Sequence, residues 1–162
     1  PEPVVVVLRG APGQGKSVCS EMLARMLSYT LVGKSSYYAF NSATKHFDGY
    51  KQQAVTIIDD LGQDTSGEDF RLFCQLVSTT ECIVPMADLP EKGMHFKSEI
   101  LIANTNLPSF NPITVSDPAA IKRRIFLDLT VEANRAYTKS DGTLDLVRAL
   151  QSTGKESQSP LF

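Results

Sequence analysis

Apolar and polar residues along the chain form two recurring patterns: short continuous apolar runs, and longer segments with helical spacing. Four runs, at residues 4–8, 55–58, 100–103 and 125–129, are mainly apolar and rich in β-branched residues. Runs without regular polar alternation are typical of strands that are buried on both faces of a sheet. Residues 37–40 are a further candidate, for an edge strand.

Segments with helical spacing lie between and after these runs. Residues 17–27 are predicted to form a helix whose apolar face comprises Val18, Met22, Leu23, Met26 and Leu27. Residues 69–77 are predicted to form a second, with Phe70, Phe73, Cys74 and Val77 on one face. Residues 144–150 predict a last short helix, and residues 107–118, which are punctuated by proline and asparagine, predict a loop. Strands that alternate with helices indicate an α/β fold with a central, mainly parallel sheet.

Length and composition indicate one globular domain. The chain has 162 residues, of which 42% are apolar and 21% charged, and these values are ordinary for a soluble globular protein. We expect a core at residues 1–135 and a C-terminal extension at residues 136–162, with a short helix and a tail that reads as truncated. The chain starts without methionine and enters an apolar run within three residues, so we also expect flanking segments outside it.

Charge, cysteine content and hydropathy exclude several classes of protein. Sixteen basic and eighteen acidic residues give a formal charge of -2, so the chain lacks the strongly basic balance of a nucleic-acid-binding protein. Cys19, Cys74 and Cys82 lack the paired spacing of a zinc site, and we interpret them as buried or free thiols. No apolar run approaches the length of about 20 residues that a membrane-spanning helix needs, so we expect this fragment to be soluble.

A glycine-rich motif follows the first apolar run. It matches G-x-x-x-x-G-K-[ST] without a gap and comprises Gly10, Ala11, Pro12, Gly13, Gln14, Gly15, Lys16 and Ser17. A strand before the motif and a helix after it are the context of a P-loop, in which backbone N–H groups surround a phosphate chain. Lys16 is predicted to neutralise the phosphates and Ser17 to bind Mg²⁺. The alternative is a plain glycine-rich turn.

Two carboxylates end the second apolar run, in the sequence VTIIDD. An unpaired charge at the end of a buried strand is unfavourable, so a cation is expected near it. In P-loop NTPases a strand-end aspartate holds magnesium, and a second acid can orient the attacking water. We assign Asp59 to the metal and Asp60 to the water, although the reverse order fits as well. Alternatively, Asp60 only caps the following turn.

The third and fourth runs carry further candidates. In ILIANTN, Asn104 and Asn106 share a strand face with Ile100 and Ile102. Asn106 lies farther toward the carboxyl end, where an amide can bind the γ-phosphate and the water, and the alternative is that both asparagines only form a loop. In IKRRIFLDL, Arg123 and Arg124 precede the last strand. They can stabilise a phosphoryl group on a neighbouring subunit, whereas the plainer alternative is a solvated basic turn.

Taken together, these motifs resemble a superfamily-three helicase of the AAA+ type of P-loop NTPase. The resemblance narrows at residues 73–93, FCQLVSTTECIVPMADLPEKG, which look like the segment after the acidic strand of the picornavirus 2C-type ATPases. The sequences DDLGQDTSGEDF and HFDGY look like members near the aphthovirus and cardiovirus branch. The similarity covers residues 3–129, nearly the whole chain.

This resemblance implies a three-layer α/β/α fold and a viral ATPase and candidate RNA helicase that uses ATP and Mg²⁺. It places Lys16 and Ser17 in Walker A, Asp59 and Asp60 in Walker B, Asn106 in motif C, and Arg123 and Arg124 at the arginine-finger positions. Family members form homo-hexameric rings that hydrolyse ATP between subunits, bind RNA, and act in genome replication and encapsidation. Residues 86–97, with Lys92 and Lys97, would then lie near the pore, although a solvated loop is the alternative reading.

The resemblance also implies a location and partners that these residues do not themselves carry. The family acts in the host cytoplasm on membranous replication complexes, with membrane and viral-protein contacts through flanking regions. Its amphipathic amino-terminal helix, a cysteine-rich zinc element and a complete C-terminal assembly helix are missing from this sequence, so the fragment alone is expected to be a monomer. Two rivals to an ATPase are a nucleotide-gated assembly module without productive hydrolysis and a small P-loop nucleotide kinase. The kinase would need a lid with several arginines, which is not evident in the sequence.

Overall fold

A five-stranded parallel sheet forms the centre of the protein. The structure, a computed structural model, describes residues 2–41, 46–78, 92–110 and 118–153. The strands are β1 (Val4–Arg9), β2 (Tyr38–Asn41), β3 (Val55–Asp59), β4 (Ile100–Thr105) and β5 (Ile125–Thr130). Their order is β2-β3-β4-β1-β5, and every pairing is parallel. The predicted α/β fold with a mainly parallel sheet is therefore confirmed, and residues 38–41 form the expected edge strand.

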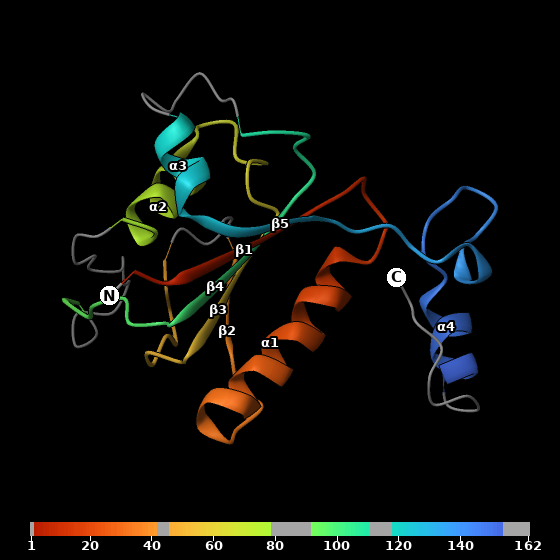
Figure 1. The fold of residues 1–162 in the computed structure, drawn as a ribbon, viewed down its shortest axis with the longest axis horizontal. Coiled ribbons are helices and arrows are strands. Elements are labelled where there is room, and N and C mark those ends of the chain that lie inside the picture. Colours follow the sequence, from red (N-terminus) through yellow and green to blue (C-terminus); the bar gives the residue numbers. More distant parts are fainter. Residues whose placement is uncertain (1, 42–45, 79–91, 111–117, 154–162) are drawn as a thin grey trace.

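Helices cover both faces of this sheet, which gives the expected three layers (Figure 1). Helix α1 (Lys16–Val32) covers one face, and α2 (Glu68–Leu76) and α3 (Pro118–Arg124) lie on the other. The larger core cluster, rich in phenylalanine, fills the space under α2 and α3, and a smaller cluster lies under α1. A 3-10 turn, Arg135–Tyr137, and helix α4 (Leu146–Thr153) follow β5 and lie beside the sheet rather than on it (Figure 1).

The strand register brings the carboxyl ends of the central strands to one edge of the sheet. Leu8 of β1 pairs with Asn104 of β4, and Ile58 of β3 pairs with Ala103 of β4. The residues that follow these positions therefore emerge side by side. This is the edge at which open parallel sheets bind their ligands.

The face that α1 turns to the sheet differs from the predicted one. Ser20, Ala24 and Ser28 are buried, whereas Met22 and Met26 are 49% and 66% exposed. The prediction that both methionines face the core is wrong, and Leu23 and Leu27 only flank the contact. The three small residues are spaced four apart and let the helix lie close to the strands, which larger side chains would prevent.

Two other sequence expectations are refined by the structure. A short helix, α3, precedes β5 where we predicted only a loop and a basic segment. Pro118 begins this helix, at a common first helical position for proline. The last helix runs over Leu146–Thr153 rather than residues 144–150. Among the described helices, none combines the length and apolar character needed to cross a bilayer.

The cysteines that can be placed are half-buried free thiols, as expected. Burial raises the pKa of Cys19 and of Cys74 above the ordinary value. Cys82 and the tail after residue 153 lie outside the described residues. No described cluster of three or more histidine, cysteine or acidic residues has the geometry of a metal site.

Candidate nucleotide-binding site

The glycine-rich motif forms the turn between β1 and α1, and its glycines are required by geometry. Gly13 and Gly15 have φ angles of 78° and 93°, in the left-handed region that side chains disfavour. A Cβ on Gly10 would lie 2.5 Å from the carbonyl oxygen of Val131, and one on Gly13 would lie 2.6 Å from Cγ2 of Thr143. The loop is therefore tightly enclosed by the chain that follows β5.

The first turn of α1 has backbone N–H donors and no acidic side chain that would compete with an anionic ligand for them. Gly15 is the N-cap residue and offers no side-chain acceptor, and the first turn, which the structure describes in full, contains no aspartate or glutamate. The first N–H groups of a helix lack intrahelical partners, and together with the helix dipole they favour an anion. This end of α1 is thus suited to a phosphate group.

A cavity of about 330 Å³ opens at this turn. The residues that line it are Pro12, Gly13, Gly15, Lys16, Ser17, Val18, Asp59, Asp60, Asn106 and Leu144. The structure thus brings together the predicted lysine, serine, acidic pair and asparagine from three separate strand ends. Gly10, Ala11 and Gln14 belong to the same turn but do not line the cavity.

Lys16 is folded back onto its own loop. Its side chain is buried at 8% exposure, and its Nζ donates hydrogen bonds to the carbonyl oxygens of Gly10 at 2.9 Å and Ala11 at 2.8 Å. Burial lowers the pKa of Lys16, and the nearby carboxylates of Asp60 and Asp59 act in the opposite direction. The ammonium is therefore held at the cavity in a setting that another negative charge would stabilise.

Ser17 and Asp59 meet on the cavity wall with the chemistry of a magnesium site. The Ser17 hydroxyl donates to the two carboxylate oxygens of Asp59 at 3.2 and 3.3 Å. Mg²⁺ prefers oxygen ligands and usually takes few from the protein. One hydroxyl and one carboxylate at the phosphate-binding turn fit that requirement.

Asn104 positions Asp59, a role that the sequence did not reveal. Its side chain is 1% exposed, and Nδ2 donates at 2.9 Å both to Oδ1 of Asp59 and to Oγ of Ser20. The alternation along β4 correctly put Asn104 on the face of Ile100 and Ile102, which is the face that α1 covers. What the alternation could not show is that Asn104 ends in the helix contact whereas Asn106 reaches the cavity.

The turn after β3 is sharp and internally fixed. Asp60 has a φ of 53°, an uncommon conformation for a residue other than glycine. The buried carboxylate of Asp69 accepts hydrogen bonds from the N–H groups of Gly62 and Phe70, both at 2.7 Å. Asp69 was not a predicted site residue; it holds the turn that presents Asp60 to the cavity.

The two predicted arginines, Arg123 and Arg124, lie far in space from the cavity of their own chain. They end α3 immediately before β5, at the amino ends of the strands, which is the opposite edge of the sheet from the P-loop. Arg124 Nη1 donates to the carbonyl oxygen of Val77 at 3.0 Å and lies 3.4 Å from a carboxylate oxygen of Glu2. Arg123 is exposed. The structure does not bring either arginine to the Lys16 and Ser17 of its own chain.

A segment after β5 closes the outer side of the P-loop, and no sequence motif pointed to it. The Leu144 N–H donates to Gly13 O at 2.7 Å, and Gln14 Nε2 donates to Gly142 O at 2.9 Å. Gln14 also accepts from the N–H of Ala133 at 3.0 Å. Gln14 therefore binds the protein rather than facing the cavity, while Leu144 supplies an apolar wall.

Comparison with known proteins agrees with this site. A sequence model of the RNA helicase family matches residues 6–107. The chain is 54% identical over 154 residues, or 95% of its length, to a genome polyprotein of Cosavirus A. It is 50% identical over 92% of its length to that of Theiler's murine encephalomyelitis virus (strain DA), and 44% identical over 99% to that of encephalomyocarditis virus.

The chain spans only 6% to 7% of the length of these polyproteins. The family match nevertheless covers most of the sheet and all the residues of the cavity except Leu144. The relatives include cardioviruses and a cosavirus. The chain therefore belongs to the RNA helicase family, as a picornavirus 2C-type domain of helicase superfamily three.

Proposed function

We propose that this domain binds ATP with Mg²⁺ and hydrolyses it at an interface with a neighbouring copy of the same domain. The observation that carries the proposal is the convergence of Lys16, Ser17, Asp59, Asp60 and Asn106 on one cavity. These residues come from three strand ends that are distant in sequence. A glycine-rich turn without catalytic function would not require that convergence.

The P-loop would bind the phosphates through its backbone. The free N–H groups at the start of α1 and the left-handed glycines at positions 13 and 15 suit a chain of negative oxygens. Lys16 now donates to the carbonyl oxygens of Gly10 and Ala11. It would turn from those two acceptors to the β- and γ-phosphates.

Ser17 and Asp59 are the residues that would hold Mg²⁺. When bound, Mg²⁺ neutralises charge on the phosphates and makes the terminal phosphoryl group easier to attack. Asn104 would keep the Asp59 carboxylate oriented through its 2.9 Å hydrogen bond. Partners of this kind fix the direction of a metal ligand.

Asp60 and Asn106 would position the attacking water. Both line the cavity beyond the P-loop, so a water between them would face the end of a triphosphate held by the loop. The Asp60 carboxylate would accept a proton of that water, while the Asn106 amide would donate to a γ-phosphate oxygen. This division gives each side chain a bond that it is chemically able to make.

Arg123 and Arg124 would complete the site of a neighbouring copy. They lie at the opposite edge of the sheet from the cavity, so they cannot complete their own site. In a ring, however, one subunit's far edge can face the next subunit's nucleotide. We therefore propose a homo-hexamer with shared active sites, in which this fragment alone can bind nucleotide as a monomer but hydrolyse it only slowly.

The wider biology that we propose follows from family membership. It comprises RNA binding, roles in viral genome replication and encapsidation, and action in the host cytoplasm at membranous replication complexes, with other viral proteins as partners. Lys92 and Lys97 are exposed and available to RNA phosphates. Residues 86–91 of the predicted pore segment lie outside the described residues.

ATP turnover in matched variants of the longer protein, with its flanking regions restored, tests the catalytic assignment. Lys16→Ala should weaken ATP binding, and Asp60→Asn should retain binding while lowering turnover by about 10²–10⁴-fold. Lys34→Ala, at an exposed lysine after α1, is the control and should match the unaltered protein. Unchanged hydrolysis in Lys16→Ala and Asp60→Asn would remove the proposal. Binding without turnover at any concentration would favour the assembly module, and phosphate transfer to AMP would favour the kinase.

Mixing variants of the longer protein, with its flanking regions restored, tests the shared site. Lys16→Ala lacks a working P-loop but retains its arginines, whereas the double variant Arg123→Ala with Arg124→Ala has the opposite defect. Each alone should be nearly inactive, and a mixture should regain turnover because some interfaces combine an intact cavity with intact arginines. Turnover per molecule that is independent of protein concentration, with no recovery in the mixture, would contradict hydrolysis between subunits.

A further inference from the structure

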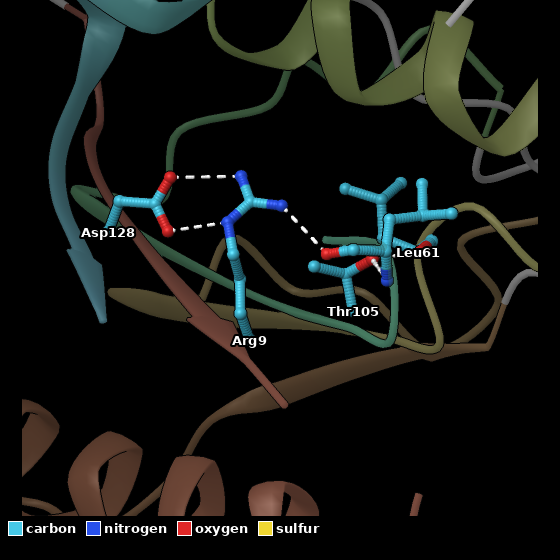
Figure 2. Close-up of polar contacts among 5 residues, drawn as sticks. Arg9, Leu61, Thr105 and Asp128 are labelled. Carbon is cyan, nitrogen blue, oxygen red and sulfur yellow. Dashed lines mark hydrogen bonds and ion pairs between the residues drawn. The ribbon is translucent and has the colours of Figure 1, made fainter. Parts of the chain in front are cut away.

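Arg9, the last residue of β1, joins β5 to the loop that follows β4 (Figure 2). Its Nε and Nη2 donate to the two carboxylate oxygens of Asp128 in β5, at 2.6 and 2.9 Å. Its Nη1 donates to the carbonyl oxygen of Leu107 at 3.0 Å. One guanidinium group therefore makes a forked ion pair on one side and a backbone contact on the other.

The surroundings of Arg9 fix the guanidinium in place. Its side chain is only 13% exposed, compared with 43% for Asp128. The guanidinium carbon lies 4.1 Å from the centre of the Phe110 ring, which is 1% exposed. A planar guanidinium that is stacked, forked and largely desolvated has little freedom to rotate. Exposed surface pairs, in contrast, are weak and mobile.

The loop held by Arg9 carries Asn106. On one side of Asn106, the buried Thr105 hydroxyl donates to Leu61 O at 2.7 Å and accepts from the Leu107 N–H at 3.0 Å (Figure 2). On the other side, the Leu107 side chain fills the space above Gly62, where an added Cβ would collide with it. Asn106 thus lies between two fixed residues. Thr105 contacts the turn after the acidic pair, and Leu107 contacts both that turn and Arg9.

We propose that Arg9 is a positioning residue, which holds the Asn106 side chain at the γ-phosphate position through its contact with Leu107. This inference rests on the proposed hydrolysis. Asp128 is the anchor of the arrangement, because it orients the guanidinium from β5. Arg9 itself does not line the cavity, so its effect must pass through the loop.

The proposal predicts a separation of turnover from binding. Arg9→Ala should lower kcat by about 10–10²-fold, since a small misplacement of a catalytic group has this effect. The affinity for ATP with Mg²⁺ should change by less than about threefold, because the hydrogen bonds of the Arg9 side chain go to Asp128 and Leu107 and not to the P-loop. Arg9→Lys keeps the positive charge but cannot form the forked ion pair with Asp128. Its kcat should lie between those of Arg9→Ala and the unaltered protein. Asp128→Asn, at a half-exposed position, should lower kcat less than Arg9→Ala and also leave the affinity nearly unchanged. It replaces Arg9→Ala as the test if that variant does not fold.

The control is an arginine in an ion pair without a link to the loop. Arg25 pairs with Glu21 on the exposed side of α1, with Nη2 3.0 Å from Oε1, and Arg25→Ala should leave kcat and affinity unchanged. A merely structural role of Arg9 would lower stability but not the turnover of the folded fraction. Equal kcat in Arg9→Ala, Asp128→Asn and the unaltered protein would overturn the proposal.

Hydrogen–deuterium exchange tests the positioning without relying on hydrolysis. In the nucleotide-free protein, peptides covering residues 104–110 should exchange faster in Arg9→Ala and in Asp128→Asn than in Arg25→Ala. Peptides from the first turn of α1 should exchange alike in all three variants. Unaltered exchange at residues 104–110 would contradict the positioning role of Arg9 even if ATP turnover were established. Faster exchange in a protein that never hydrolyses ATP would instead contradict the proposed function alone.

Discussion

Two asparagines, one in β4 and one in the loop just after it, should respond in opposite ways when each is replaced by alanine. Asn104 is 1% exposed and donates to Asp59 and Ser20, whereas Asn106 is half-buried and lines the cavity. We expect Asn104→Ala to act mainly on stability. Asn106→Ala should act mainly on ATP turnover.

The size of the stability loss follows from the hydrogen bonds of Asn104. A bond to a carboxylate contributes about 1.5–3 kcal/mol and a neutral bond to Ser20 about 1 kcal/mol. Part of this is offset, because Asn104 Oδ1 is buried without a hydrogen-bond partner among the described residues, and removing such an atom recovers about 1–3 kcal/mol. The cavity left by truncation adds to the loss. The net loss is about 2 kcal/mol, or about 4–8 °C in Tm for a domain of this size.

Urea denaturation and thermal melting, together with ATP turnover, check the pair. Asn106→Ala should remain within about 0.5 kcal/mol of the unaltered protein and lose about 10²–10³-fold in kcat. Asn104→Ala should melt earlier and need more Mg²⁺ for ATP binding, because Asp59 loses its orienting donor. The reasoning is refuted if Asn104→Ala is as stable as the unaltered protein, or if Asn106→Ala is the more destabilised of the two.

Three further predictions concern the helix face, the P-loop and its lysine. Ala24→Leu should cost about 1–3 kcal/mol by overpacking the contact of α1 with the sheet, whereas Met26→Ser should stay within about 0.5 kcal/mol in the same denaturation assay. Gly13→Ala should abolish nucleotide binding in a fluorescent-nucleotide titration, since it combines a φ of 78° with a Cβ 2.6 Å from Thr143; Thr143→Ala alone should bind normally. The lowered pKa of Lys16 makes the nucleotide-free fold less stable when that amine is charged, so this contribution to stability rises with pH through the lowered pKa. Bound phosphates should raise this pKa again, so calorimetry in buffers of different ionisation enthalpy should detect proton uptake on binding at alkaline pH, and Lys16→Met should show none.

The strands and the main features of the site could be predicted because they depend on local patterns. A run such as residues 4–8 has to be buried on both faces, and parallel strands place their carboxyl ends at one edge. The polar residues that follow those runs, Asp59, Asp60 and Asn106, therefore had to meet the P-loop. Their presence in one cavity follows the geometry of a parallel sheet, whereas their catalytic roles stay predictions.

The parts that could not be predicted depend on close approach between distant segments. The inner face of α1 is formed by Ser20, Ala24 and Ser28. A search for regularly spaced apolar residues does not detect a face made of small or polar ones. The partners of Gln14 lie more than a hundred residues away, at Ala133 and Gly142. No local signal marks such contacts, because they depend on where the chain returns after β5.

The position of β1 between two strands that follow it in the sequence has a consequence for how the protein folds. Its neighbours are β4 and β5, whose first residues, Ile100 and Ile125, are made long after the strand itself. During synthesis the apolar segment Val4–Arg9 must wait for both partners, because pairing between residues so distant in sequence is slow and leaves apolar surface exposed. Within this domain, the glycine-rich turn is thus translated before most of the sheet and is among the last parts to acquire its shape.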